Sequence, residues 1–311
     1  MNNVMQLTLN NPLIVFLGPT ANGKTRLSLS VAEHFNAEII SADSRQVFRR
    51  MDIGTGKDLE EYGATPYHLI NIAEPGEEYN LFRFASDFKV AFNDITRRGR
   101  LPFLVGGTGM YLDAVLQRYA LTRAPIDEAL RDELFSASHE VLLEKLATLA
   151  PSLHNQTDLQ DKTRTIRAIE IALAEQNNAE TLSWPEYSPL VIGLQYPRTT
   201  TRKRITERLN ERLKAGMIEE AQSLLDSGVS HESLQHYGLE YRFLSLYLKG
   251  EIKYNDMFQK LNSAIHQFAK QQEKWFRKIE SKGVRIHWLD TEFDLTSQTK
   301  SLIETHLKEP K

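Results

Sequence analysis

Short, uninterrupted apolar runs alternate with helical patterns over the first third of the chain. Helical periodicity covers residues 24–35 and 81–98, and the second segment places its phenylalanines on one face. The apolar runs, each of a length typical of a buried strand, are residues 12–17 (PLIVFL), 37–42 and 101–105, with a weaker one at 67–72. Strands that alternate with helices at this spacing predict a parallel sheet with crossover helices.

After the last of these strands the pattern changes. Only helical patterns occur between residues 127 and 177, and an apolar strand pattern returns at 189–196. The remaining elements that we expect are helices at 200–227, 239–248 and 254–281, and a short strand at 284–289. The sequence therefore predicts an α/β core formed by residues 1–121 and 188–311, interrupted by a helical insertion at 122–187.

The composition restricts the class of protein. The chain has 311 residues, of which 25% are charged and 41% hydrophobic, as in a soluble globular protein. It contains no cysteine, which excludes disulfides, thiolate zinc sites and a cysteine nucleophile. The net charge of −3 excludes a protein that is basic over its whole surface, but it allows a local basic groove that binds nucleic acid.

The sequence gives no sign of a membrane segment. No apolar stretch approaches the roughly 20 residues that span a bilayer. The first residues show neither the basic segment nor the cleavage pattern of a secretion signal. We therefore expect a cytoplasmic protein that does not bind a membrane.

A glycine-bounded loop between the first strand and the first helix carries the strongest chemical signal. It matches G-x-x-x-x-G-K-[ST] at every fixed position, and a chance match in a chain of this length is on the order of 1%. Its residues are Gly18, Pro19, Thr20, Ala21, Asn22, Gly23, Lys24 and Thr25. Backbone N–H groups of such a loop bind phosphate, the lysine reaches terminal phosphate oxygens, and the threonine hydroxyl can hold Mg²⁺. The loop predicts a polyphosphate site but leaves the compound and its reaction open.

An acidic residue elsewhere in the chain is needed to interpret this loop. A nucleoside triphosphatase usually has another apolar strand that ends in a metal-binding aspartate. The strand at 101–105 is followed by Gly-Gly-Thr, so the good candidate is Asp43, directly after the strand at 37–42. From the residues alone, Asp43 is a metal ligand, a general base or a helix cap beside Ser44.

Six motifs in the same order and spacing resemble the tRNA dimethylallyltransferase family, the bacterial enzymes that prenylate adenosine-37. They are GPTANGKT (18–25), SADSRQVFRRMDIGTGK (41–57), YHLINI (67–72), LVGGTGMYL (104–112), DKTRTIRAIE (161–170) and RITERLNERLKAGMIEEA (204–221). The resemblance covers almost the whole chain. It implies a P-loop NTPase-like α/β core with a helical insertion that binds tRNA.

The resemblance also implies a reaction. A dimethylallyl group passes from dimethylallyl diphosphate to N6 of adenosine-37 in tRNA, and diphosphate is released. By resemblance, Asp43 is the catalytic base and Thr20 lies close to the reacting centre. The P-loop holds the diphosphate together with Arg208, and Mg²⁺, bound through Thr25, is the cofactor. We expect the protein to act as a monomer.

The tRNA contacts are expected by resemblance as well. They would come from the block after the second strand, from the loop after the double glycine and from the insertion. The residues are Asp43, Ser44, Arg45, Gln46, Thr108, Arg164 and Arg167. Because the chain as a whole is slightly acidic, its affinity for the anticodon stem-loop must come from individually placed cations.

The chain departs from the family pattern at several positions. The common GTAKP is GTGKD (54–58), Phe48 replaces a tyrosine, and the Gly-Tyr-x-Glu pattern is GLEY (238–241). His266 and Gln271 stand where arginines are expected, which bears on substrate range more than on reaction type.

Three alternatives to the tRNA enzyme stay open. One is a P-loop kinase or NTPase that acts on a nucleoside-like substrate. Another is a prenyltransferase that modifies a free adenine nucleotide, for which the long helical insertion would be unnecessary. The third is a related protein that binds the substrates without turnover.

Overall fold

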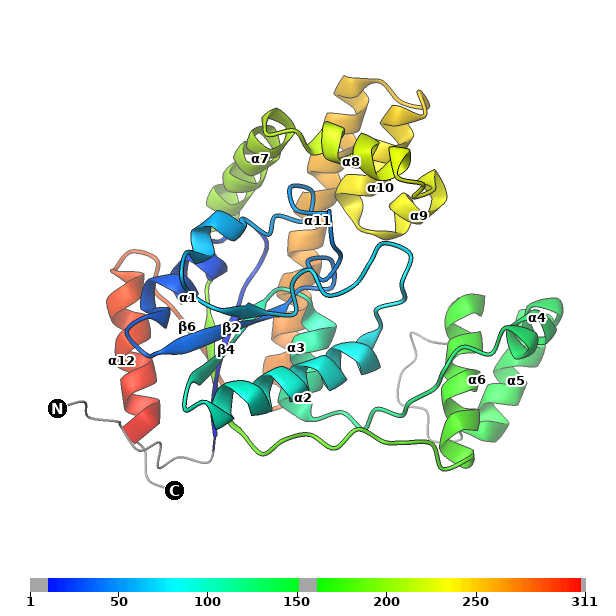
Figure 1. The fold of residues 1–311 in the computed structure, drawn as a ribbon, viewed down its shortest axis with the longest axis horizontal. Coiled ribbons are helices and arrows are strands. Elements are labelled where there is room, and N and C mark those ends of the chain that lie inside the picture. The colour runs from blue at the N-terminus through cyan, green and yellow to red at the C-terminus, as the bar shows by residue number, and fades with distance from the viewer. Residues whose placement is uncertain (1–10, 151–160, 309–311) are drawn as a thin grey trace. The chain divides into compact units, whose positions relative to one another are not determined.

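Six parallel strands form the central sheet of the chain, in the order β3-β2-β4-β1-β5-β6 (Figure 1). A computed structural model describes residues 11–150 and 161–308; the first residues, considered above for a secretion signal, lie outside this range. The strands are β1 (Pro12–Leu17), β2 (Ala37–Ala42), β3 (Tyr67–His68), β4 (Leu101–Gly106), β5 (Ser188–Gly193) and β6 (Ile286–Trp288). The predicted parallel α/β core is confirmed. Within the described part of the chain, no helix is long and apolar enough to cross a membrane.

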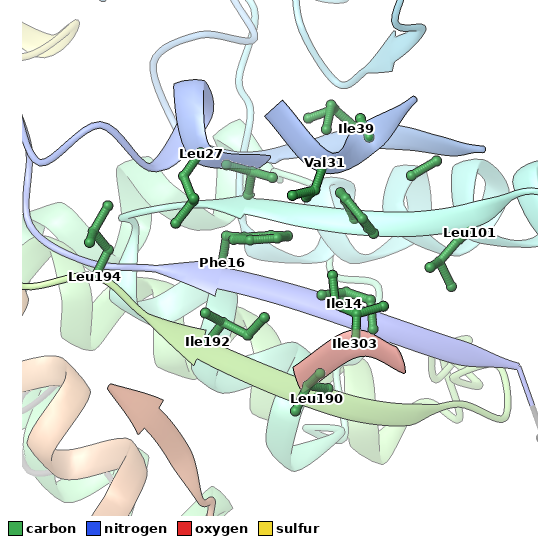
Figure 2. Close-up of a cluster of buried hydrophobic side chains, with 14 of the residues drawn as sticks. Ile14, Phe16, Leu27, Val31, Ile39, Leu101, Leu190, Ile192, Leu194 and Ile303 are labelled. Atoms are coloured by element: carbon green, nitrogen blue, oxygen red, sulfur yellow. The ribbon is translucent and has the colours of Figure 1, made fainter. Parts of the chain in front are cut away.

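Both faces of the sheet are covered, which explains why its strands are apolar without alternation. Helices α1 (Lys24–Ala32) and α12 (Leu295–Lys308) cover one face. Figure 2 shows Leu27 and Val31 of α1 and Ile303 of α12 packed over the sheet residues Ile14 and Phe16. On β1, the intervening residues Leu13 and Val15 are equally buried.

Helix α2 (Leu81–Arg97) packs against β2 and β4, and α3 (Gly109–Gln117) packs against α2. The phenylalanine face predicted for α2 is buried, and Phe84 stacks on Tyr111 of α3 with ring centroids 3.9 Å apart.

A second hydrophobic core lies among the helices that follow β5. These helices are α7 (Arg198–Lys214), α8 (Met217–Asp226), α9 (His231–His236), α10 (Leu239–Leu248) and α11 (Tyr254–Ser281). Val47, Phe48 and Met51, from the long loop after β2, belong to this core. The loop is therefore held by the helices of the second half of the chain, and it brings the end of β2 close to α7 and α8.

The structure differs from the predicted elements where the backbone turns left-handed. Leu69 (φ +64°) and Asn71 (φ +56°) end β3 after two residues, although the apolar pattern continues. Gly216 (φ +101°) divides the segment 200–227 into α7 and α8. Helices α3, α9 and α12 and the short 3₁₀ helix η1 (Leu59–Tyr62) are additional to the prediction.

Residues Tyr119–Trp184 form a compact unit of their own. The helices among its described residues are α4 (Glu128–Ser136), α5 (His139–Leu149) and α6 (Lys162–Gln176), each beginning at a side-chain cap: Asp127, Ser138 and Asp161. The three helices enclose a small core that includes Leu134, Leu142 and Ile169. The predicted helical insertion, 122–187, differs from this unit by three residues at each end.

A charged cluster joins the start of β2 to its neighbours. Glu38 is only 2% exposed. His68 Nε2 lies 2.6 Å from its carboxylate, Arg98 donates at 2.6 Å and Arg100 at 3.0 Å. Burial raises the pKa of Glu38, but the hydrogen bonds from His68 and Arg98 outweigh it, so the pKa lies below its ordinary value.

The Glu38 cluster makes stability depend on pH. Because the folded pKa is depressed, the stabilisation is present above the unfolded value of about 4.3 and is lost as the pH falls through the folded pKa. Glu38→Gln is expected to lower the free energy of unfolding by about 2 kcal/mol at pH 7, with a smaller difference below about pH 4. Urea unfolding at pH 7 and at a pH below about 4 measures the difference in free energy of unfolding, with Glu33→Gln, at an exposed position, as the control. A pH-independent difference would contradict it.

Candidate functional site

The predicted phosphate loop curls between β1 and α1 and is tied to β5. A side chain at Gly18 would place its Cβ 2.2 Å from the carbonyl oxygen of Leu194, so only glycine fits there. The amide of the buried Asn22 donates to that same carbonyl at 3.4 Å, and its oxygen accepts from Thr201 of α7 at 3.2 Å. Gly23 is left-handed (φ +80°) and precedes the first turn of α1. The loop therefore has a fixed shape.

Lys24 points back over the loop. Its Nζ donates to the carbonyl oxygen of Pro19 at 2.8 Å, so the side chain closes the ring of backbone around the expected phosphate position. Burial lowers the pKa of Lys24 to about 7; the neighbouring charge of Arg208 adds to this, and Asp43 opposes it. An anion bound beside Lys24 would restore its charge. Thr25, partly exposed, is in the first turn of α1.

Gln272 of α11, which the motif analysis did not select, joins the phosphate loop to the end of β4. Its Oε1 accepts from the backbone N–H of Thr20 at 2.8 Å, and its Nε2 donates to the carbonyl oxygen of Gly107 at 2.8 Å. A single amide thus fixes the position of Thr20 relative to a neighbouring strand end. The sequence marks this helix only through the departures at His266 and Gln271, and no motif marks Gln272 itself.

Asp43 lies at the carboxyl end of β2, next to the end of β4. Its Oδ1 accepts from the backbone N–H of Arg45 at 2.8 Å and of Gln46 at 3.4 Å, which fixes the carboxylate on the turn. The backbone N–H of Ser44 donates to Thr108 Oγ1 at 3.1 Å, and the N–H of Thr108 donates back to β2 at 3.2 Å. Asp43, Ser44 and Thr108 are therefore brought together, as their assignment to one site requires.

Gln46 and Arg208 meet on the loop that follows. Gln46 accepts from Ser41 at 3.0 Å and donates to the carbonyl oxygen of Gly56 at 3.1 Å. Arg208 donates to the same carbonyl at 3.3 Å and pairs with Asp58. The charge of Arg208 also adds to the effect of burial in lowering the pKa of Lys24. Arg208 therefore lies near both the loop after β2 and the phosphate loop.

Two further residues that were not predicted hold this loop. Glu220 of α8 accepts three consecutive backbone N–H groups, those of residues 52–54, at 2.7–2.8 Å, and the hydroxyl of Tyr241 at 2.6 Å. The fully buried Lys57 donates to Phe48 O, Asp52 Oδ1 and Asn71 Oδ1 at 2.5–2.6 Å. Only the fold reveals the backbone partners of Glu220, because they are more than 160 residues away in sequence.

The remaining cations have different surroundings. Arg204 lies over the ring of Tyr196, 3.9 Å from its centroid, and Arg45 is exposed beside Gly238. Of the two departures on α11, His266 lies 3.3 Å from the carbonyl oxygen of Arg202, and Gln271 is exposed.

Arg164 and Arg167 lie in the insertion, whereas the other predicted site residues lie in the core unit. Arg167 pairs with the buried Glu170 at 2.7 Å and donates to the carbonyl oxygen of Ala124 at 2.8 Å. Arg131 binds the same carboxylate at 2.6 Å. Arg164 is exposed. The two arginines that the sequence treats alike therefore have different structural roles.

The donor set around the phosphate loop suits a magnesium ion that arrives with phosphate. Among the described residues, no group of three or more histidine, aspartate or glutamate side chains could hold a metal by itself. Mg²⁺ typically takes one or two protein ligands and completes its shell with phosphate oxygens and water. A hydroxyl in the first turn of α1, that of Thr25, is compatible with that arrangement.

These features define a P-loop α/β protein with a phosphate site at the carboxyl ends of parallel strands. The sequence matches the IPP transferase family over residues 46–279. The chain belongs to the IPP transferase family, and curated relatives with 54–58% identity are named tRNA dimethylallyltransferase.

Individual relatives span nearly the whole chain. A tRNA dimethylallyltransferase of Syntrophotalea carbinolica is 58% identical, covering 89% of this chain and 94% of the relative. One from Trichlorobacter lovleyi is 54% identical over 94% of this chain and 96% of the relative. The solved tRNA isopentenylpyrophosphate transferase of Bacillus halodurans is 34% identical, with a TM-score of 0.68 and coverage of 95% and 94%. A eukaryotic dimethylallyltransferase solved acting on tRNA has a TM-score of 0.74 at 26% identity, covering 95% of this chain and 77% of that one.

The lowered pKa of Lys24 predicts proton uptake when an anion binds. At pH 8 a lysine with a pKa of about 7 is mostly neutral, and a bound diphosphate favours its charged form. Binding should therefore take up nearly one proton more in the wild type than in Lys24→Arg, whose guanidinium is always charged. Calorimetry with inorganic diphosphate in buffers of different ionisation enthalpy measures the uptake. Equal uptake by both proteins would show that Lys24 is already charged.

Proposed function

We propose that the protein transfers a dimethylallyl group from dimethylallyl diphosphate to N6 of adenosine-37 in tRNA and releases diphosphate. The observation that carries this proposal is the juxtaposition of a phosphate loop with Asp43 and Thr108 at adjoining strand ends, in a chain of this family. The names of the curated relatives and the solved eukaryotic enzyme acting on tRNA support it.

The donor's diphosphate would bind on the phosphate loop. Its negative charge grows as the bond between the allylic carbon and oxygen breaks, so leaving-group stabilisation is the main requirement. Backbone N–H groups, Lys24 and Arg208 supply positive potential at this place. Mg²⁺, held by the Thr25 hydroxyl and the diphosphate oxygens, would neutralise part of the remaining charge.

Asp43 would act as the general base. The exocyclic amine of adenine is a weak nucleophile, and it must lose a proton as its new bond to carbon forms. In this step the N–C bond forms, the allylic C–O bond breaks, and the amine proton passes to the Asp43 carboxylate. The turn that fixes Asp43 Oδ1 holds the carboxylate in one orientation, and Gln272 fixes Thr20 beside the leaving group.

The tRNA would be recognised at two places. Ser44, Arg45, Gln46 and Thr108 surround Asp43 and provide the polar groups that read a flipped-out adenine. The helical insertion would contact the tRNA backbone, with Arg164 as an exposed cation. We further propose that the enzyme acts as a monomer.

The alternative functions find less support. A kinase or NTPase needs a metal-binding carboxylate at the end of a second strand. Because β4 is followed by Gly107 and Thr108, this role would fall to Asp43 after β2, but the curated relatives are named as transferases. A prenyltransferase for free nucleotides does not need the insertion of residues 119–184. For a protein without turnover we would expect loss of the P-loop or of Asp43, and both are intact.

The proposed base makes a direct prediction. Asp43→Asn keeps an oxygen acceptor for the turn but cannot take the proton, so transfer of label from dimethylallyl diphosphate to tRNA should fall by about 10²-fold or more. Binding of inorganic diphosphate should stay within about threefold. The assay uses labelled donor, Mg²⁺ and unmodified tRNA, with AMP and ATP as competing acceptors.

Three outcomes would contradict the proposal. Label in AMP but not in tRNA would identify the free-nucleotide enzyme. ATP hydrolysis without transfer would identify an NTPase. Equal loss of transfer and diphosphate binding in Asp43→Asn would show that Asp43 holds the metal or the loop and is not the base.

Substitution of the two insertion arginines should affect different properties, stability for Arg167 and tRNA binding for Arg164. Arg167→Ala removes a partner of buried Glu170 and is expected to lower stability by about 2 kcal/mol. Arg164→Ala should leave unfolding within about 0.5 kcal/mol of the wild type but raise the KM for tRNA severalfold, with the donor KM unchanged. Thermal unfolding and steady-state kinetics measure both. A changed donor KM in Arg164→Ala would refute its assignment to tRNA.

A further inference from the structure

Arg212 of α7 occupies space that a side chain at position 56 would fill. A Cβ added to Gly56 would lie 1.4 Å from Arg212 Nη2 and 2.7 Å from Arg208 Nη2. Because both distances start from one point, the two terminal nitrogens are at most about 4 Å apart. Position 56 is alanine in the common GTAKP pattern, and the departure to glycine makes room for the second guanidinium.

The guanidinium of Arg212 is poorly satisfied within the protein. Its side chain is 14% exposed, and its Nε has no hydrogen-bond partner among the described residues. Its ion pair with Glu240 is long, at 3.8 Å. Burial lowers the pKa of Arg212 to about 10, and the neighbouring charge of Arg208 adds to this, whereas Glu240 opposes it. A largely buried cation of this kind is costly unless an anion lies beside it.

Arg212 continues a row of cations that starts at the phosphate loop. The charge of Arg208 helps to lower the pKa of both Lys24 and Arg212, after burial, so Arg208 lies near both cations. Two carboxylates offset the positive charge of these arginines: Asp58 pairs with Arg208, and Glu240 pairs with Arg212. Both lie in segments that depart from the family pattern, GTGKD and GLEY. These two segments and the two arginines therefore form one connected group around Gly56.

We propose that Arg212 is a second phosphate-binding guanidinium of the site, positioned by Gly56 and Glu240. It would bind, together with Arg208, a non-bridging phosphate oxygen. The identity of the phosphate rests on the proposed function: it is either the donor's diphosphate or a backbone phosphate of the tRNA next to the modified base. Two adjacent guanidinium groups suit either one, because phosphate accepts several charge-assisted hydrogen bonds.

The test compares variants that remove or displace this group. Arg212→Met keeps an unbranched side chain but removes the charge, and Gly56→Ala places a methyl group where Nη2 lies. Gly63→Ala is the control, because Gly63 also has a positive φ (+51°) but has nothing within 4 Å of the added Cβ. Calorimetry with inorganic diphosphate and Mg²⁺ measures binding at the donor site. The KM for tRNA at two salt concentrations reports the contact with a phosphate of the tRNA backbone.

If the phosphate is that of the donor, Arg212→Met and Gly56→Ala should each weaken diphosphate binding by about 10-fold or more, whereas Gly63→Ala should not. The double variant should lose no more than Gly56→Ala alone, since the added methyl group already displaces Arg212 and also crowds Arg208. If the phosphate is that of the tRNA, diphosphate binding stays unchanged, the KM for tRNA rises, and its salt dependence becomes shallower.

Other results would overturn the proposal. Unchanged diphosphate binding together with an unchanged KM for tRNA would show that Arg212 binds no phosphate. An equal loss in Gly56→Ala and Gly63→Ala, or additive losses in the double variant, would assign the effect to backbone strain. Thermal unfolding of each variant establishes that folded protein is compared. If the wild type binds diphosphate but transfers nothing to tRNA, the proposed function fails, and the calorimetric comparison still tests Arg212.

Discussion

The site depends on the mutual repulsion of three cations held close to the ends of parallel strands. Lys24, Arg208 and Arg212 follow one another from the phosphate loop along α7, and burial makes their charges expensive. The protein offsets this cost with carboxylates and backbone oxygens nearby, and a phosphate group would offset it further. The burial of Lys24, together with the repulsion from Arg208, lowers the pKa of Lys24 and so prepares the site for an anion.

Holding such groups in place requires rigid support, and that support comes from residues far away in sequence. Gln272 fixes Thr20 to the end of β4, and Glu220 binds three successive backbone N–H groups of the loop after β2. Lys57 is enclosed by three acceptors. The contacts of Gln272 and Glu220 join the two halves of the core unit on either side of the insertion, and those of Lys57 hold residues 48–71 together. The loop after β2 is therefore held rigidly beside the site, and Asp43 and Gly56 keep their positions.

Most of the fold could be predicted because the strands are short apolar runs and the helices are amphipathic. The bounds of β1, β2, α10 and α11 agree with the pattern. The prediction was less successful where hydrophobicity continues through a change of backbone conformation. Leu69 and Asn71 end β3 although the sequence stays apolar, and Gly216 separates two helices that have continuous periodicity. Periodicity reports which face is buried, but it does not report the sign of φ at a single residue.

The sequence by itself determined the phosphate loop, the position of Asp43 after a buried strand and the helical insertion, because each depends on residues that are neighbours in the chain. The tertiary structure decided which cations belong together. Arg164 and Arg167 share a motif, but Arg167 is bound to buried Glu170. Arg212 looks like one more charge on a basic helix, yet its guanidinium lies over Gly56. Such roles depend on what packs against a side chain, and contacts between segments more than 150 residues apart leave no local pattern in the sequence.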